Sequence, residues 1–292
     1  MAKGKSRQGA HKRPTPTQRR AEREAAAAKA AAQAARRRRQ RWLIAGGAVL
    51  VVVAVVIAAI VVPRMRGLRT MPPGSVQAVA GPDGQLVPQN ASANGAALVV
   101  NPGVSAALTV DYHTDYGCPP CRAQAITLGP ILEDLAARGE IVLNYHVRSY
   151  LDTFWGGTLS TQAALAATCA DVVGRFPAYH LALFSIAPDQ QHGYSDDILR
   201  NVAPPKAGIT GNALTTFQTC FDNRQTENWL TKAEDFNANT PIPLPGRVDF
   251  DNGVRQAPAF FVNGAYIENP DDIPVTSPAA ALAYLKQVAG VA

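Results

Sequence analysis

Two cysteines, Cys118 and Cys121, enclose two prolines and lie directly between a predicted strand and a predicted helix. Residues 107–113 form an apolar, β-branched run that is typical of a buried strand. Residues 122–138 have apolar side chains at helical spacing along one stripe. Because a helix N-terminus stabilises a thiolate, and because this spacing lets the two sulfurs form a disulfide, the pattern predicts a redox-active dithiol.

The chain has four cysteines, and none lies in residues 1–117. Four cysteines allow three pairings, but the short spacing favours pairing of Cys118 with Cys121 and leaves Cys169 and Cys220 as a second, structural bridge. Zinc needs four ligands, usually in two close pairs, and Cys169 and Cys220 are isolated, so we expect no metal site. A purely structural 118–121 disulfide is a further alternative, but it would not explain the position between a strand and a helix.

Residues 43–62 are 20 consecutive residues without a charged or strongly polar side chain. At about 1.5 Å rise per residue, a helix of this length spans a bilayer. A cleaved signal peptide is the alternative, but signal peptides have short leading regions and apolar runs of about 7–15 residues. Here 42 residues precede a longer apolar run, so we predict a single transmembrane helix at 43–62.

Positive charge is concentrated before this apolar segment. Residues 1–42 contain 14 lysines and arginines against two glutamates, whereas the rest of the chain contains 14 basic and 20 acidic residues. Basic residues beside a transmembrane helix stay in the cytoplasm, which predicts a cytoplasmic tail that touches the lipid bilayer and an extracytoplasmic C-terminal part. An oxidising compartment suits the four cysteines of that part. The net charge of +6 averages the tail with a mildly acidic domain, so it does not indicate nucleic-acid binding.

The rest of the sequence divides into a linker and a globular domain. Residues 63–95 are rich in Pro, Gly, Ser, Asn and Ala and predict an extracytoplasmic linker, with a small hairpin around Val79 to Val87. Residues 96–292 are long enough to bury one sizeable core. This boundary gives four parts: the basic tail, the transmembrane helix, the linker and the domain.

The predicted elements of the domain occur in the order β-α-β, a block of helices, then β-β-α. The first strand–helix–strand unit implies a parallel crossover, and Asn263-Gly264 favours a tight hairpin turn. Ser277 and Pro278 provide an N-cap and a first-turn proline for the last helix. We predict strands at 107–113, 140–147, 259–262 and 265–268, and helices at 122–138, 160–173, 177–185, 195–202, 213–223, 227–237 and 279–288.

With this order of elements, the domain resembles the DsbA-like branch of the thioredoxin superfamily and, in plan, its membrane-anchored actinobacterial members. The strand–Cys-x-x-Cys–helix start, the helical insertion and the segment 256–264 (Gln-Ala-Pro-Ala-Phe-Phe-Val-Asn-Gly) carry the resemblance. It implies an α/β thioredoxin-like fold with a helical insertion, preceded by a single transmembrane helix. It also implies Cys118 as the exposed nucleophile, Cys121 as the buried resolving thiol and Pro258 as the cis-proline.

The resemblance further implies a substrate-binding edge. In this family the backbone just before the cis-proline pairs with an extended substrate, and Ala257 has that position here. We assign Pro119 and Pro120, between the two cysteines, to the same substrate-facing surface. Three residues near the second strand also fall where substrate-facing loops could lie but are not included in the predicted site: Arg148, Phe154 and Trp155.

Two departures from the family pattern affect the chemistry. The family places a buried carboxylate six residues before the nucleophile, but Tyr112 has that position here. The neighbouring acid, Asp111, would point to the other face of the strand and is left out of the predicted site. Ala257 replaces the Thr or Val that usually precedes the cis-proline, and so removes a side chain near the sulfurs.

The prolines between the cysteines bear on the redox potential. A stabilised Cys118 thiolate favours the reduced form and makes the disulfide more oxidising. Pro119 and Pro120 have no N–H groups, and no histidine lies between the cysteines. We therefore expect the pKa of Cys118 to be lowered less than in the strongest oxidants of the family, and the potential to be intermediate.

These features predict a membrane-anchored, extracytoplasmic thiol–disulfide oxidoreductase that introduces disulfides into exported proteins. The resemblance implies cysteine-containing exported proteins as substrates and a membrane redox partner of the DsbB or VKOR type, without an organic cofactor or metal. One alternative is a reductase or isomerase, although the 33 residues of the linker are too few for the dimerisation domain usual in isomerases. Another is a non-catalytic thioredoxin-fold binding domain.

Overall fold

The computed structural model describes residues 79–80, 85–188, 193–244, 248 and 250–291. The predicted tail, the predicted transmembrane helix at 43–62 and most of the predicted linker lie outside these residues. Within the described part of the chain, no helix combines the length and the apolar composition needed to cross a membrane. The described residues belong to one unit, which spans residues 64–292.

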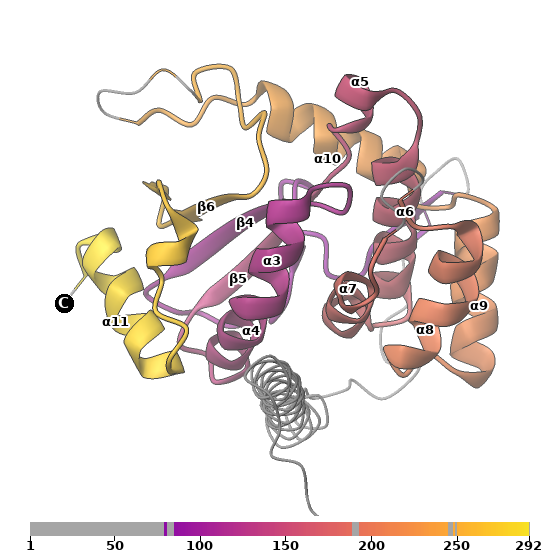
Figure 1. Ribbon diagram of the computed structural model, residues 1–292, viewed down its shortest axis with the longest axis horizontal. Coiled ribbons are helices and arrows are strands. Elements are labelled where there is room, and N and C mark those ends of the chain that lie inside the picture. The colour runs from indigo at the N-terminus through magenta and orange to yellow at the C-terminus, as the bar shows by residue number, and fades with distance from the viewer. Residues whose placement is uncertain (1–78, 81–84, 189–192, 245–247, 249, 292) are drawn as a thin grey trace, which may run out of the picture. The chain divides into compact units, whose positions relative to one another are not determined.

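A mixed five-stranded sheet forms the centre of the domain, in the order β3-β5-β4-β6-β7 (Figure 1). Its strands are β3 (Leu98–Val99), β4 (Thr109–Asp115), β5 (Val142–Arg148), β6 (Ala259–Val262) and β7 (Ala265–Ile267). β4 and β5 pair in parallel, which confirms the predicted crossover, and the other neighbours pair antiparallel. The turn between β6 and β7 has positive φ at Asn263 (48°) and Gly264 (80°), as a two-residue hairpin turn requires.

Helices cover both faces of this sheet and form a block beside it (Figure 1). They are α3 (Pro119–Thr127), α4 (Gly129–Ala137), α5 (Asp152–Trp155), α6 (Leu159–Val172), α7 (Phe176–Ser185), the π-helix η2 (Ile198–Val202), α8 (Ala203–Lys206), α9 (Gly211–Asp222), α10 (Glu227–Asn239), the 3-10 helix η3 (Pro270–Asp272) and α11 (Pro278–Ala289). α4 and α11 pack together on one face of the sheet, and α10 packs on β5. α6, α7, η2, α8 and α9 form the helical insertion. Ser277 caps α11 as predicted, since its hydroxyl accepts a hydrogen bond from the Ala280 N–H (3.2 Å).

The helix predicted at 122–138 is two helices, α3 and α4, which meet at Leu128. Pro130 causes the break, because it has no N–H for the helical ladder and its ring clashes with the preceding turn. α3 also begins earlier than predicted, at Pro119, because proline fits the first turn of a helix, where N–H groups have no partner within the helix. Residues 118–121 therefore lie at the very tip of α3.

Part of the predicted linker is packed against the helical insertion. β1 (Val79–Ala80) and β2 (Leu86–Val87) pair antiparallel, which confirms the predicted small hairpin, although its turn lies outside the described residues. The Leu86 N–H donates to the Gln225 carbonyl (2.6 Å). The backbone and side-chain N–H groups of Asn90 both donate to the Asp171 carboxylate (2.9 and 2.7 Å). The packed chain thus includes residues before position 96.

Candidate active site

Cys118 and Cys121 form a disulfide at the N-terminus of α3. Cys118 is the N-cap of this helix, and the Cys121 N–H points at its sulfur (3.1 Å). The Cys118 N–H donates to the Asp115 carbonyl (3.1 Å), so a tight turn connects the end of β4 to the helix. Pro119 and Pro120 make up the first turn. The Cys121 amide is therefore the first N–H of α3 that can stabilise a Cys118 thiolate.

Both cysteines of this pair are buried. Cys121 has no exposed surface and Cys118 is only 4% exposed, so the expectation of an exposed Cys118 is wrong for this oxidised form. Part of the reason is that the Ala257 carbonyl oxygen lies 3.3 Å from the Cys118 sulfur. In the disulfide this is a packing contact, since only a thiol carries a hydrogen to donate. The exposed part of the Cys118–Cys121 bridge is therefore a small part of Cys118.

The loop before β6 faces the dithiol. Antiparallel pairing of β6 with β4, with His113 opposite Ala259, brings this loop beside the end of β4 and therefore beside Cys118. The Ala257–Pro258 peptide bond is cis. The sequence therefore predicted three of the groups that meet here: Cys118, Cys121 and the Ala257-Pro258 segment.

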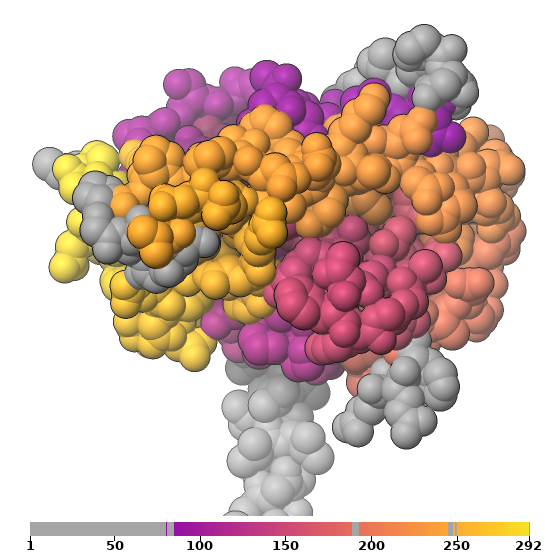
Figure 2. Space-filling model, turned by 90° about the horizontal axis from the view of Figure 1, so that it is seen from above, coloured from indigo at the N-terminus to yellow at the C-terminus, as the bar shows by residue number. Residues whose placement is uncertain are grey.

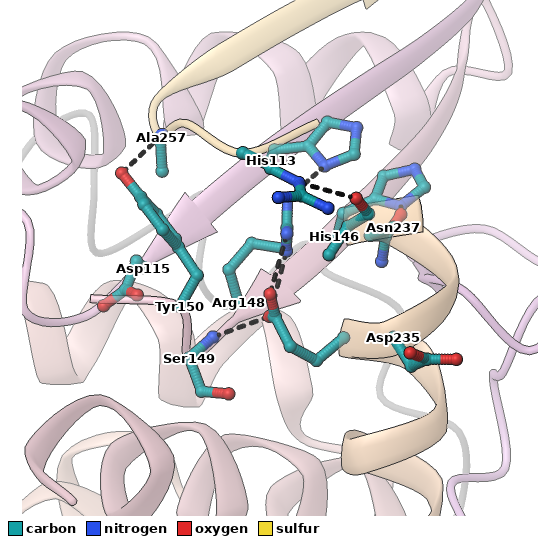
Figure 3. Close-up of polar contacts among 12 residues, drawn as sticks. His113, Asp115, His146, Arg148, Ser149, Tyr150, Asp235, Asn237 and Ala257 are labelled. Carbon is teal, nitrogen blue, oxygen red and sulfur yellow. Dashed lines mark hydrogen bonds and ion pairs between the residues drawn. The ribbon is translucent and has the colours of Figure 1, made fainter. Parts of the chain in front are cut away.

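The loop before β6 also makes a contact with Tyr150 that the sequence does not indicate. The Ala257 N–H donates to the Tyr150 hydroxyl (3.1 Å), and Figure 3 shows this side chain reaching across from the end of β5. On the face seen in Figure 2, the rose-coloured segment with α5 lies beside the amber-coloured segment that leads into β6. Phe154 and Trp155 of α5 are 69% and 65% exposed, respectively. Phe154 contacts the Tyr150 ring, so at least one exposed aromatic side chain borders the site.

Arg148 is fully buried and cannot face a substrate. Its guanidinium forms a two-pronged ion pair with Glu234 of α10 (2.8 and 3.0 Å), drawn in Figure 3. The same carboxylate accepts a hydrogen bond from the Ser149 N–H (3.0 Å). His113 accepts a further bond from Arg148 (3.3 Å), since burial, with the charges of His146 and Arg148, holds the His113 pKa well below its usual range. Arg148 therefore fixes the start of the loop that carries Tyr150.

Asp115, three residues before Cys118, connects the same loop to the turn before α3. Its carboxylate accepts hydrogen bonds from the Ser160 hydroxyl (2.5 Å), the Gly117 N–H (2.8 Å) and the Leu151 N–H (3.2 Å). Burial raises the pKa of this carboxyl to about 6 in spite of the three donors. Gly117 has no room for a side chain here, since a Cβ would lie 2.7 Å from the Ser160 hydroxyl.

The two faces of β4 separate Tyr112 from Asp111, as the strand alternation predicts. The Tyr112 hydroxyl donates to the Cys121 carbonyl (3.1 Å) on the dithiol side. Asp111 instead bonds to Asn144 (2.9 Å) and His146 (3.1 Å) on the other face, away from the disulfide. The position of the family's buried carboxylate is therefore occupied by a phenol that hydrogen-bonds the active-site backbone.

A buried carboxyl on the dithiol side of the sheet comes from α4. Glu133 is 3% exposed and accepts a hydrogen bond from the Tyr145 hydroxyl (3.4 Å). Burial raises the pKa of Glu133 to about 8. Two adjacent acids, Glu133 and Asp134, lie in the predicted helix, and the apolar spacing alone does not indicate which of them faces the core.

Cys169 and Cys220 form a second disulfide, which connects α6 to α9 within the helical insertion. Both residues are completely buried. The Thr226 hydroxyl lies 3.6 Å from the Cys169 sulfur. This bridge is enclosed between helices, whereas the Cys118–Cys121 bridge lies at a helix tip.

A central sheet with the Cys118–Cys121 disulfide at the tip of α3, facing a cis-proline loop, defines a thioredoxin-like fold. A protein-family model described as thioredoxin (Thioredoxin_4) matches residues 103–275, more than half of the chain. The chain therefore belongs to this thioredoxin family, and the predicted α/β thioredoxin-like fold of the domain is confirmed. The search of curated proteins found no significant match.

Several solved structures are similar to this chain. MdbA from Actinomyces oris, described as a thiol-disulfide oxidoreductase, is 15% identical, with 70% of this chain and 92% of that chain covered and a TM-score of 0.52. DsbG from Mycobacterium tuberculosis is 22% identical (68% and 90% covered, TM-score 0.48). BdbD from Bacillus subtilis is 21% identical (73% and 98% covered, TM-score 0.49). The predicted resemblance to the DsbA-like branch is confirmed at the level of the fold.

Proposed function

We propose that this protein is a membrane-anchored, extracytoplasmic thiol–disulfide oxidoreductase that introduces disulfides into exported proteins. The observation that carries the proposal is the disulfide between Cys118 and Cys121 at the tip of α3, with the Ala257 carbonyl 3.3 Å from the Cys118 sulfur. A reactive disulfide beside the backbone of the cis-proline loop suits a reaction with an extended polypeptide. The names of the similar solved structures point to the same chemistry.

The reaction transfers two electrons from the substrate to the enzyme, and the two substrate thiols release their protons to solvent as they form thiolates. A substrate thiolate attacks the Cys118 sulfur, a substrate–Cys118 bond forms, and the Cys118–Cys121 bond breaks. Cys121 leaves as a thiolate and takes up a proton. A second substrate thiolate then attacks the substrate sulfur of the mixed disulfide, which forms the substrate disulfide and releases Cys118 as a thiolate. The Cys121 N–H, 3.1 Å from the Cys118 sulfur, stabilises that leaving group.

Trapping tests the proposal. In a Cys121→Ser variant of the full chain, the mixed disulfide with Cys118 is resolved slowly, so exported proteins should accumulate as reducible adducts on non-reducing gels. The matched control is the Cys118→Ser/Cys121→Ser double variant, which has no active-site sulfur. If the single variant gives no more adducts than the double variant, the protein is a non-catalytic binding domain and the proposal is wrong.

The 33-residue linker is too short for the dimerisation domain usual in isomerases, which supports the oxidase direction. An oxidase then requires a membrane partner of the DsbB or VKOR type to reoxidise the dithiol. An oxidase is kept mainly as the disulfide in cells, whereas a reductase or isomerase is kept mainly as the dithiol. Acid quenching of cells followed by thiol alkylation measures this state at Cys118 and Cys121. A mainly reduced pair would favour the reductase alternative.

Anchoring in the membrane is supported by the 20-residue apolar segment and the basic residues before it. The full chain should stay with membranes after alkaline carbonate extraction, and protease added outside the membrane should digest the domain but spare residues 1–42. Deletion of residues 43–62 should release the domain. Recovery of the intact full chain in the soluble fraction would contradict the anchor.

A further inference from the structure

The backbone group that a substrate would use at Ala257 already has a partner. The Ala257 N–H donates to the Tyr150 hydroxyl (3.1 Å), as the dashed line in Figure 3 shows. We propose that Tyr150 is a specificity-determining residue whose hydroxyl takes the place of a substrate carbonyl oxygen until an extended peptide displaces it. This inference rests on the proposed function and deepens it, because it states what a substrate must supply.

The loop holds Tyr150 in place through its two neighbours. The Ser149 N–H donates to Glu234 (3.0 Å), and the Leu151 N–H donates to Asp115 (3.2 Å). Glu234 is itself fixed by the fully buried Arg148. Because the backbone on both sides is anchored, the Tyr150 side chain can rotate away from Ala257 without unfolding the loop.

The side-chain surroundings of Tyr150 leave it free to make this movement. Its ring has an edge-on contact with Phe154 (5.7 Å between centroids), and the Arg148 guanidinium lies 5.7 Å from its centroid. Phe154 is mostly exposed and Tyr150 is only partly buried, so the ring lies between the buried Arg148 and a surface group and is not enclosed in the core. The bond between Ala257 and Tyr150 is therefore a contact at the edge of the site.

An extended peptide can replace the Tyr150 hydroxyl as the acceptor of the Ala257 N–H. Its carbonyl oxygen accepts the Ala257 N–H, as in the addition of a strand to a sheet edge, and the Tyr150 hydroxyl turns to water. An amide carbonyl is a stronger acceptor than a phenol oxygen, so the exchange favours the peptide. A small thiol without a peptide backbone gains nothing from it. The hydroxyl consequently competes with polypeptide substrates and sets their rate relative to small thiols.

A Tyr150→Phe variant of the full chain tests the inference, because phenylalanine keeps the ring and removes the competing oxygen. The oxidised protein is mixed with an unstructured cysteine-containing peptide or with dithiothreitol, and the reduced enzyme is counted by mass after acid quenching. The ratio of the peptide rate to the dithiothreitol rate should rise about two- to tenfold, the range expected for one hydrogen bond. Tyr284→Phe, on α11, is the matched control, and its ratio should equal that of the wild type.

Two results would overturn the inference in distinguishable ways. If the wild type reacts with the peptide but Tyr150→Phe leaves the ratio unchanged or lowers it, the hydroxyl does not compete, and the proposed function stands without it. If the wild type does not react with the peptide at all, the proposed function fails and this inference fails with it. The thermal unfolding midpoint of each variant, compared with that of the wild type, identifies effects that come from loss of fold.

Discussion

Pro119 and Pro120 form the first turn of α3 and leave the Cys121 N–H as the nearest helical donor to the Cys118 sulfur (3.1 Å). A thiolate at this helix tip is therefore stabilised by fewer hydrogen bonds than one followed by residues with N–H groups. Since the stability of the thiolate sets the redox potential, each restored donor should make the disulfide more oxidising.

Pro120→His restores an N–H and adds a side chain that can carry positive charge. One further hydrogen bond to the thiolate should raise the potential of the Cys118–Cys121 pair by about 30 to 60 mV. Equilibration with glutathione buffers measures this potential. Pro278→Ala, at the first turn of the distant α11, is the control and should leave it unchanged. A potential that stays constant or falls in Pro120→His would contradict the donor argument.

Glu133 makes stability depend on pH. Burial raises its pKa from 4.5 to about 8, so the folded chain binds this proton more tightly than the unfolded chain. The contribution of Glu133 to the free energy of unfolding is therefore fully present below about pH 4.5 and is lost as the pH rises towards 8. Glu133→Gln keeps an acceptor for Tyr145 and should stabilise the protein at pH 7 by on the order of 3 kcal/mol.

Urea unfolding at pH 4.5 and at pH 8 checks this sign. The wild type should lose more stability between the two pH values than Glu133→Gln does, while the buried Asp115 and Asp171, whose pKa values are also raised to about 6, keep part of the slope in both. Glu140→Gln, a more exposed carboxyl just after α4, is the control. Equal slopes in wild type and Glu133→Gln would show that Glu133 is ionised in the folded state at no cost.

At the scale of elements, the turn between β6 and β7 also fixes the start of β4. Asn263 has a φ of 48°, its side-chain oxygen accepts the Thr109 N–H (2.8 Å), and its side-chain N–H donates to the Ala107 carbonyl (2.9 Å). Asn263→Ala removes both bonds and strains the backbone, so it should lower the free energy of unfolding by about 2 kcal/mol. Asn263→Gly removes the bonds without the strain and should lose less.

Denaturant unfolding of the three proteins separates these effects. A loss in Asn263→Ala no larger than in Asn263→Gly would mean that the left-handed conformation costs alanine nothing here. Unchanged stability in both variants would mean that the two bonds to the start of β4 are worth no more than bonds to water.

The strands and the larger helices follow from sequence patterns, because period-two and helical spacing record which side chains face the core. The elements that sequence reasoning missed are short or lie at a break. α5 and β3 are too short to show periodicity, and the division between α3 and α4 was present in the sequence as Gly129-Pro130 but was outweighed by the apolar stripe. A proline inside a helical pattern breaks or kinks the helix even where the surrounding residues keep the apolar spacing.

The site was predictable where the motif is local and not where the chain folds back on itself. Cys118, Cys121 and Pro258 stand in recognisable segments, so the sequence indicates them. The Tyr150–Ala257 and Arg148–Glu234 contacts join residues 107 and 86 positions apart, and no spacing rule indicates such pairs. The burial of Cys118 likewise depends on the loop packed against it and on no property of its own segment.

For the whole molecule, the Cys169–Cys220 bridge connects two helices 51 residues apart in sequence. A crosslink of this length restricts the unfolded chain, so Cys169→Ser/Cys220→Ser should lower the free energy of unfolding by about 4 kcal/mol. Thermal and denaturant unfolding measure the loss. The potential of the Cys118–Cys121 pair should stay the same in this variant, and a large change in it would show that the helical insertion adjusts the site.

The Cys169–Cys220 bridge is enclosed between α6 and α9, whereas the Cys118–Cys121 bridge lies at the tip of α3. This difference determines how many electrons a redox titration of the folded protein detects. Neither Cys169 nor Cys220 has any exposed surface, so a reductant must wait for the insertion to open before it reaches them. Mild redox titrations of the native chain will therefore register one two-electron couple, although the chain contains sulfurs for two.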